Sequence, residues 1–223
     1  MRVVIVGIGV LGEELVAALL ERDHEVIAID IDEQVCDRVY SNHGVVAVNG
    51  SGTDLHVLQE ARVDTADAVV MLMHQDSDNV TCTLLSRSLG VPQLVARMRD
   101  NGYEDSYRAA GISHLVRVSE VLRNQIVTQL EHPRIEELLG VGDHQVRIFS
   151  VQLDENATAV GQRVVDLAQH DSFPERCLLL GSFRGDKPKL HILRGGDQIE
   201  AGDTLLIIAG EDDIDRIMKV VVG

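Results

Sequence analysis

Short apolar runs alternate with amphipathic stretches along the first half of the chain. The runs lie at 3–6, 26–29, 45–48, 68–73, 94–97 and 115–116. Runs this short and this uniformly apolar are typical of strands buried on both faces of a sheet. Between them, apolar residues recur at helical spacing after Gly12 and over about 33–41, 55–61, 80–89 and 102–110. This alternation predicts an α/β fold with an open, doubly wound parallel sheet.

The second half of the chain has a different pattern. A helix is expected at 119–131, where Pro133 ends it, and a short second helix at 134–139. Residues 145–153 alternate in polarity as a half-buried strand does. Further strands are expected near 177–183, 189–193 and 203–209, with helices near 163–169 and 212–220. Strands grouped with two helices predict a second, smaller α+β domain.

These patterns divide the chain into three parts. The doubly wound domain is expected at 1–118 and the α+β domain at 143–223. The segment between them, 119–142, is expected to hold two crossover helices and to end in a glycine hinge at 140–142. The helix at 119–131 carries an apolar stripe of Leu122, Ile126 and Leu130. The stripe needs an apolar surface to cover, on its own sheet or on a second copy of the chain. In the second case the segment is a dimerisation arm, and the sequence leaves both open.

Composition narrows the class of protein. The net charge of −16 argues against nucleic acid and against anionic lipid surfaces as partners. The three cysteines show no metal-ligand spacing and no disulfide pattern, which is typical of reduced thiols in the cytoplasm. The chain opens on a predicted strand and holds no run of about 18 apolar residues, so we expect neither a signal peptide nor a membrane span.

Gly7, Gly9 and Gly12 follow the first strand at G-x-G-x-x-G spacing and open a helix. Gly7 allows a tight turn, Gly9 lets a pyrophosphate approach the backbone, and Gly12 lets the helix pack closely. Free N–H groups at the helix start then face the phosphates. Asp30 ends the second strand, where a carboxylate can accept bonds from both ribose hydroxyls. The set predicts a nucleotide site, although ribose and diphosphate are common to NAD, ATP and ADP. The alternative is a glycine turn with a structural role alone.

The carboxyl ends of parallel strands meet in one crevice, so the loops at 7–12, 30–32, 49–54, 73–79 and 97–99 are expected to line it. Arg97 ends a strand there and can pair with a phosphate or with one of the many acids. His74 is the histidine nearest the crevice and is expected to face solvent. Asp76 and Asp78 are expected to cap the helix at Val80, and Asn79 can turn towards a ligand.

Several motifs together resemble one family. They are Gly7-Ile8-Gly9-Val10-Leu11-Gly12, Ile29-Asp30, Gly50-Ser51-Gly52-Thr53-Asp54, Asp76-Ser77-Asp78-Asn79, Ala96-Arg97 and Gly111-Ile112. With the small second domain, this set resembles the RCK (regulator of potassium conductance) proteins, the TrkA- and KtrA-like subunits of bacterial Trk and Ktr potassium uptake systems. The resemblance covers nearly the whole chain.

The resemblance implies a regulatory, non-enzymatic role. Dimers would build a tetrameric or octameric ring beneath a membrane potassium transporter of the TrkH or KtrB kind. One NAD, NADH, ATP or ADP per chain would change the shape of that cytoplasmic ring and gate transport. The implied nucleotide contacts are Gly7, Ile8, Gly9, Val10, Leu11, Gly12, Asp30, Ile31, Gly52, Thr53, Leu72, Met73, His74, Asn79 and Arg97. Glu120 matches a position that holds Mg²⁺ or Ca²⁺ at the dimer interface of some relatives.

The chain also departs from some relatives. ATP-sensing members carry an arginine in the glycine loop, where this chain has Ile8, Val10 and Leu11. The arginine expected after Val164 and Val165 for cyclic di-AMP is missing as well. Two alternatives remain: an NAD-dependent oxidoreductase with a small substrate domain, and a regulator of another cation transporter. The oxidoreductase needs an acid–base group at the crevice, and the sequence supplies no convincing one.

Overall fold

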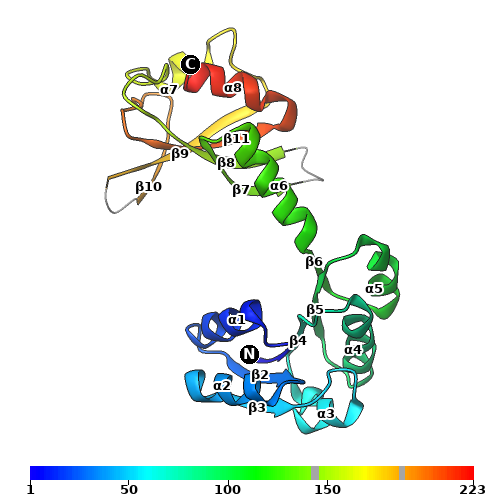
Figure 1. The fold of residues 1–223 in the computed structure, drawn as a ribbon. Coiled ribbons are helices and arrows are strands. Elements are labelled where there is room, and N and C mark those ends of the chain that lie inside the picture. The colour runs from blue at the N-terminus through cyan, green and yellow to red at the C-terminus, as the bar shows by residue number, and fades with distance from the viewer. Residues whose placement is uncertain (142–145, 186–188) are drawn as a thin grey trace. The chain divides into compact units, whose positions relative to one another are not determined.

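The computed structural model describes residues 1–141, 146–185 and 189–223, with the backbone alone at 137–141. The chain forms two compact units, Met1–Leu122 and Arg123–Gly223, and each is described by itself (Figure 1). The division falls inside one helix, close to the start of the segment that the sequence sets apart at 119–142.

The first unit alternates strands and helices as predicted. Its elements are β1 (Arg2–Val6), α1 (Val10–Leu20), β2 (Glu25–Asp30), α2 (Glu33–His43), β3 (Val46–Asn49), α3 (Leu55–Glu60), β4 (Ala68–Met71), α4 (Asp76–Ser88), β5 (Gln93–Met98), α5 (Glu104–Ala110), β6 (His114–Arg117) and the start of α6 (Val118–Glu131). The strands pair in parallel in the order β3-β2-β1-β4-β5-β6. The doubly wound, Rossmann-like architecture is therefore confirmed, and the strand order reverses beside β1.

Two apolar layers hold the first unit together. Along β1, Val3 and Ile5 pack with Val16 of α1, whereas Val4 and Val6 belong to the opposite layer with Leu58 of α3. Helices α1 and α2 thus lie on one face of the sheet, and α4 and α5 on the other (Figure 1). The alternation follows from the two-residue period of a strand.

The α1 face of the sheet is only half covered. Beside α1, a hollow of about 460 Å³ runs over the strands β4, β5 and β6. Apolar side chains make up most of its lining, including Leu15, Val70, Val95 and Val116. Val116 is 47% exposed. We call this hollow the groove, and an exposed apolar hollow of this kind marks an interaction surface.

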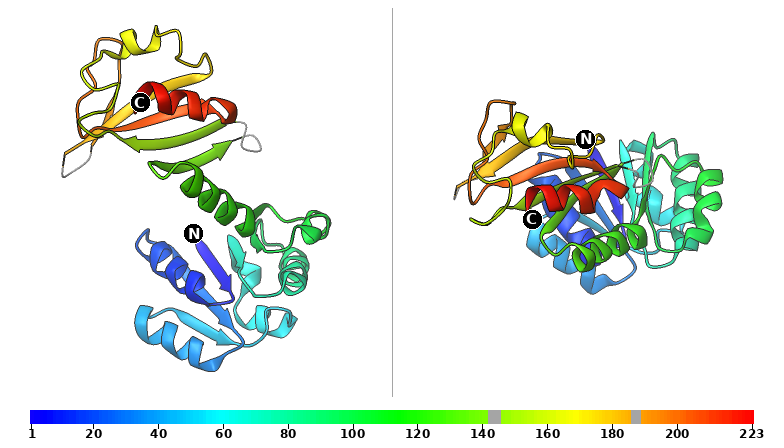
Figure 2. Two further views of the ribbon diagram at one scale, coloured as in Figure 1. Left: turned by 45° about the horizontal axis from the view of Figure 1, so that its top comes forward. Right: turned by 90° about the horizontal axis from the view of Figure 1, so that it is seen from above.

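The second unit is built on an antiparallel sheet. It contains β7 (Ile135–Val141), β8 (Val146–Gln152), α7 (Val164–Ala168), β9 (Cys177–Arg184), β10 (Lys189–Ile192), β11 (Thr204–Gly210) and α8 (Ile214–Val221). The strands follow the order β10-β9-β11-β8-β7. Figure 2 shows α8, in red, lying across the strands, and its Ile217 and Val221 share the core with Phe149 and Leu205. The smaller α+β domain is confirmed.

The predicted helix at 134–139 is wrong, because residues 135–139 belong to the strand β7 and Arg134 lies in the turn before it. Ile135 pairs with Val151 of β8, and Gly140 pairs with Arg147. Residues Glu136 to Leu139 are good helix formers, yet pairing with β8 overrides that local preference. Gly140 and Val141 therefore lie within a strand and not in a loop, while Gly142 lies outside the described residues.

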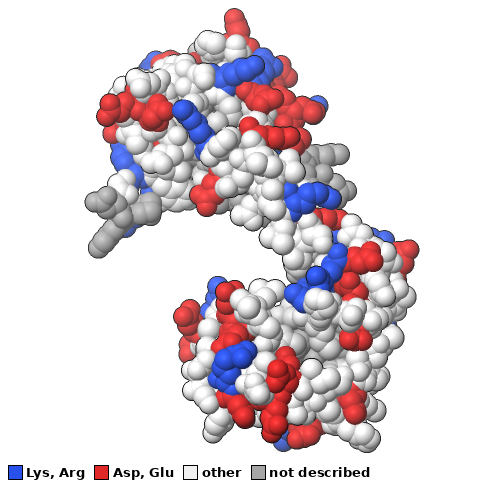
Figure 3. All heavy atoms as spheres, viewed as in Figure 1, with Lys and Arg blue, Asp and Glu red and all other residues white. Residues whose placement is uncertain are grey.

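Charge is spread over the whole molecule. Figure 3 shows Asp and Glu on both units across the face in view, with Lys and Arg scattered among them. In the parts of the chain that the structure describes, no helix has the length and apolar character needed to cross a bilayer.

Candidate functional site

The strand ends of the first unit enclose a hollow of about 380 Å³. We call it the crevice. Its lining is formed by Val6, Gly7, Gly9, Ile29, Asp30, Ile31, Gly50, Ser51, Gly52, Leu72, Met73, His74, Asp78 and Arg97. A second hollow adjoins it above the start of α1, with Gly7, Gly9, Val10, Leu11, Gly12, Glu14, Leu72 and Arg97 around it. The structure thus gathers most of the predicted site residues in one place.

The three motif glycines have different surroundings. Gly7 has a φ of +91°, and a Cβ there would meet Met73 N at 2.8 Å. A Cβ on Gly12 would lie 2.6 Å from the carbonyl oxygen of Gly7. In contrast, a Cβ on Gly9 would meet no atom within 4 Å. Gly7 and Gly12 are therefore required by the fold, while Gly9 leaves open space above the backbone, which is the room a diphosphate needs.

The start of α1 supplies free donors beside that space. Gly9 is the N-cap residue of α1 and has no side chain to occupy the first N–H groups. Glu13, in the first turn, turns away from the loop towards α2, where it bonds Arg38 at 3.1 Å and Asn42 at 3.0 Å. These bonds lower the pKa of Glu13, that from Asn42 most. An anion at the helix start therefore meets N–H groups, and the Glu13 carboxylate of the first turn is already paired.

Asp30 lies where β2 ends and is half-buried. Its Oδ2 accepts a hydrogen bond from Ile8 N at 2.6 Å, and Oδ1 accepts one from Asp32 N at 3.0 Å. Asp30 thereby fixes the glycine loop and lines the crevice at the same time. Asp32 is the N-cap of α2 and bonds Gln34 N. The two carboxylates divide the tasks, and Asp30 alone is placed for a ligand.

Arg97 borders both the crevice and the hollow above α1. Its Nε and Nη2 lie 3.4 and 3.3 Å from the carbonyl oxygen of Met73. No ion pair with a carboxylate forms here among the described residues, so the salt-bridge alternative is not what the structure shows. Burial lowers the pKa of the guanidinium, and the nearby Arg99 adds to that effect. A partly buried cation that forms no ion pair with a carboxylate among the described residues can pair with an anion.

Asn79 and Thr53 do not line the crevice. Asn79 is fully buried, and its side-chain amide bonds both the N–H and the carbonyl oxygen of Met73, at 3.0 and 3.1 Å. The hydroxyl of Thr53 lies 2.8 Å from that of Ser51. Ile8 is also buried and lines neither hollow, and its backbone N–H donates to Asp30. Ligand contacts by Asn79, Thr53 and Ile8 therefore stay predictions. In the structure, the bonds of these residues position neighbouring parts of the protein.

The helix α4 begins at Asp76, earlier than predicted, so Asp76 and Asp78 lie in its first turn and do not cap it at Val80. Asp78 lines the crevice, as do Gly50 and Ser51. All three lie in the loops at 49–54 and 73–79 that the sequence predicts at the crevice, although the individual contacts implied by the resemblance omit them. His74 is exposed as expected, with its ring nitrogens 2.8 and 3.0 Å from Arg99 Nη1.

Glu120 gives little support for a metal. Its Oε1 accepts a bond from Asn101 Nδ2 at 3.1 Å, and Oε2 lies 3.9 Å from Arg117 Nε. In the described residues, no three His, Cys, Asp or Glu side chains come together as a metal site. The Mg²⁺ or Ca²⁺ at Glu120 therefore stays an expectation from the resemblance.

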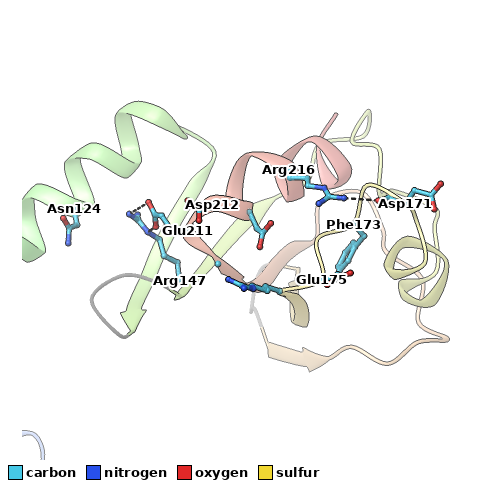
Figure 4. Close-up of a pocket in the computed structure, with 11 residues that line it drawn as sticks. Asn124, Arg147, Asp171, Phe173, Glu175, Glu211, Asp212 and Arg216 are labelled. Atoms are coloured by element: carbon cyan, nitrogen blue, oxygen red, sulfur yellow. Dashed lines mark hydrogen bonds and ion pairs between the residues drawn. The ribbon is translucent and has the colours of Figure 1, made fainter.

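The second unit has a hollow of its own, of about 960 Å³ (Figure 4). Its lining includes both negatively charged carboxylates and positively charged guanidinium groups. Arg147 pairs with Glu211 there, and Arg216 Nη2 donates to the carbonyl oxygen of Asp171 at 3.0 Å. Phe173 contributes one aromatic face. This mixture defines no single class of ligand, whereas the crevice of the first unit matches one.

The fold and the crevice define a class: a Rossmann-like domain with a glycine-loop site, followed by a small antiparallel domain. Residues 3–118 match the family model of the TrkA-N domain, and residues 148–221 match that of the TrkA-C domain. The chain therefore belongs to the TrkA-N family and carries a TrkA-C domain after it. The RCK resemblance is thereby confirmed.

Curated relatives carry a consistent name. The chain is 26% identical over 173 residues to a Trk system potassium uptake protein TrkA homolog of Methanothermobacter thermautotrophicus, covering 78% of this chain and 80% of that protein. It is 26% identical to the homolog of Archaeoglobus fulgidus and 25% to the TrkA of Halomonas elongata. These matches cover 99% and 98% of this chain but only 50% and 49% of those proteins, so the chain spans about half their length.

Solved structures share the fold over both units. The GsuK RCK domain matches all of this chain and 47% of its own, with a TM-score of 0.68 and 18% identity. The GsuK channel bound to NAD matches 98% of this chain and 39% of its own, with a TM-score of 0.65 and 18% identity. At this identity the likeness establishes the fold alone.

Proposed function

We propose that this chain is a regulatory subunit of a potassium transporter, which binds an adenine nucleotide in the crevice. The family and the names of the curated relatives support potassium uptake as the process. The observation that carries the proposal is the crevice itself. It joins an open glycine loop, a carboxylate at Asp30 and a cation at Arg97 that forms no ion pair with a carboxylate among the described residues.

NAD, NADH, ADP and ATP share the groups that this crevice accommodates. Asp30 accepts the ribose hydroxyls, the N–H groups at the start of α1 bind the diphosphate over Gly9, and Arg97 pairs with a phosphate. A neighbour in the RCK class has been solved with NAD, and another GsuK structure with ADP. The Asp30 carboxylate repels a phosphate on the ribose 2′ oxygen, so NADP is disfavoured.

The contacts of His74 favour sensing over catalysis. An oxidoreductase needs a group that moves a proton beside the nicotinamide. Both ring nitrogens of His74 lie within 3.0 Å of Arg99 Nη1, so this exposed ring already contacts a side chain of the protein itself. We therefore assign the crevice a regulatory role.

The subunit acts as an oligomer on a membrane protein. The apolar stripe of α6 is exposed, with Leu122 at 52%, Ile126 at 59% and Leu130 at 76%. The groove over β4, β5 and β6 is apolar and open. A stripe and a groove of matching character on each chain support a dimer in which α6 of one copy covers the groove of the other, and a ring of such dimers at the cytoplasmic face of the transporter.

Thermal denaturation with separate nucleotides tests the proposal. A ligand at about 100 times its Kd stabilises the folded state by about 2.7 kcal/mol. We expect NAD, NADH, ADP or ATP to raise the Tm of the full chain, and NADP to do so least. The proposed function would be refuted if none of the four nucleotides raised the Tm. It would also be refuted if the protein transferred hydride between the nicotinamide cofactor and common alcohols or acids.

A further inference from the structure

A continuous set of contacts joins the crevice to the first turn of α6. Met73 and His74 line the crevice where β4 ends. The ring of His74 lies against Arg99, which directly follows β5. The carbonyl oxygen of Arg99 in turn accepts a bond from Ser119 Oγ at 2.9 Å. Two contacts therefore lead from a ligand-facing loop to the helix that carries the exposed apolar stripe.

Asp76 stabilises the middle of this connection. The residue is only 7% exposed, and its carboxylate accepts bonds from Asp100 N at 2.9 Å, Arg99 N at 3.2 Å and Tyr107 Oη at 3.0 Å. A buried carboxylate is costly unless donors surround it. These bonds therefore fix the start of α4, the end of β5 and helix α5 in one arrangement.

Tyr107 completes the arrangement from α5. It is fully buried, and its hydroxyl lies 3.0 Å from Asp76 Oδ1 and 3.2 Å from the carbonyl oxygen of Arg97. Burial and the bond to Asp76 both raise the pKa of this phenol, so it remains a donor. Tyr107 thus connects the buried carboxylate to the strand that positions the phosphate-binding arginine.

Asn79 forms a second clamp on the crevice side. Its amide bonds both backbone groups of Met73, so the crevice loop cannot move without displacing α4. The Asp76-Ser77-Asp78-Asn79 motif therefore directs two side chains inward, one to each strand end. The structure thereby gives Asp76 and Asn79 of this motif a positioning role, while Asp78 lines the crevice.

We propose that Asp76 and Tyr107 are positioning residues that transmit nucleotide occupancy from the crevice to the first turn of α6. The inference rests on the proposed nucleotide site and names the route by which that site acts. A ligand that presses on Met73 or His74 shifts a loop bonded to the end of β5. Because Ser119 is bonded to Arg99, the start of α6 follows that shift.

Two measurements on the full chain separate binding from transmission. Calorimetry gives the affinity for NAD and for ADP. Hydrogen exchange follows the amides of residues 122–125, which are the first in α6 to donate to carbonyl groups of its first turn, with and without the nucleotide. In the wild type, we expect saturation to change the exchange rate of these amides by about fivefold or more. In Tyr107→Phe and in Ser119→Ala, we expect the affinity to stay within about threefold and that change to fall by at least about half.

Matched controls remove the same atoms elsewhere. Tyr40→Phe takes a hydroxyl from a side chain that is 64% exposed on α2. Ser88→Ala removes a hydroxyl group that donates to the carbonyl oxygen of Leu85 at the end of α4. Both controls are expected to keep the full wild-type response. Asp76→Asn is a harsher variant, and if it does not fold, Tyr107→Phe and Ser119→Ala decide.

Each remaining result has a defined meaning. A full ligand response in both Tyr107→Phe and Ser119→Ala overturns the inference, as does a loss of affinity in proportion to the loss of response. If no nucleotide binds the wild type, the proposed function fails and the inference fails with it. If a nucleotide binds but the exchange at 122–125 does not change in the wild type, the inference alone is overturned.

Discussion

The carboxylate of Asp30 accepts a hydrogen bond from the N–H of Ile8 at 2.6 Å, so the end of β2 holds the glycine loop in place. The residue predicted to bind ribose is thus also a structural part of the phosphate loop. A substitution at Asp30 acts on both functions together, and its effect on binding exceeds that of the ribose contacts alone.

Asp30→Asn is expected to weaken nucleotide binding by about 1–3 kcal/mol, because it removes a charged acceptor from the ribose and loosens the loop. Isothermal titration with NAD and ADP measures the loss. Asp32→Asn is the control, since Asp32 caps α2 without lining the crevice and asparagine caps equally well. Equal affinities for Asp30→Asn and the wild type would contradict the ribose role.

Gly9→Val is expected to abolish nucleotide binding while the fold remains. A Cβ at Gly9 meets no protein atom within 4 Å, so the added side chain fills the space assigned to the diphosphate. Loss of a favourable N-cap costs about 1 kcal/mol of stability at most. Gly196→Val, also in open space but in the second unit, is the matched control for stability. Binding retained in Gly9→Val would show that the loop is not the site.

Arg97→Met is expected to weaken binding of the diphosphate by about 1.5–3 kcal/mol, the range of a hydrogen bond to a charged group. The free energy of unfolding should change little, because no carboxylate loses an ion-pair partner in the part of the chain that the structure describes. Titrations at low and high salt measure both the affinity and its salt dependence, which should become shallower. An unchanged affinity would show that Arg97 does not bind the ligand and only bonds the carbonyl oxygen of Met73.

Arg184→Met is expected to destabilise the second unit by about 2–4 kcal/mol, since it leaves a buried carboxylate without its cation. Arg184 bonds Asp203 through Nε and Nη2 at 2.6 and 2.8 Å, and the Asp203 side chain is fully buried. Calorimetric unfolding measures the loss. Arg163→Met, whose pair with Asp166 is exposed, is the control and should change stability little.

The same pair predicts a pH dependence. Burial alone would raise the pKa of Asp203, but the bonds from Arg184 and Glu200 N outweigh it and the pKa is lowered. The stability that the pair contributes is therefore present above the unfolded pKa of about 3.9 and is lost as the pH falls through the folded value. Wild-type unfolding curves should show this loss in acid, and those of Arg184→Met should be flatter. Parallel curves would contradict the assignment.

Ile126→Asp is expected to shift a dimer towards the monomer, because it places a charge in the exposed stripe of α6. Sedimentation at several concentrations measures the change, and Val116→Asp in the groove should have the same effect. Tyr40→Asp, on the exposed face of α2, is the control. If α6 variants leave the oligomeric state unchanged, the stripe covers some other surface.

The sequence predicts what is local. The glycine spacing, the β-branched runs and Asp30 are sufficient to predict the doubly wound sheet and the position of the crevice, because strand ends share one edge. The helix predicted over Glu136 to Leu139 is wrong, because pairing with β8 makes this segment a strand. Likewise, Asp76 looks like a helix cap in sequence, yet its partner Tyr107 lies 31 residues further on. A contact between residues so far apart in sequence cannot be predicted from their spacing.

Leu72 and Arg97 border the crevice and the apolar groove alike. A nucleotide in the crevice and a neighbouring chain in the groove would therefore both contact these two residues. Thermodynamic reciprocity then requires that the nucleotide change subunit affinity by the same factor as the neighbour changes nucleotide affinity. Ligand binding and subunit assembly would then be coupled through residues that the two surfaces share.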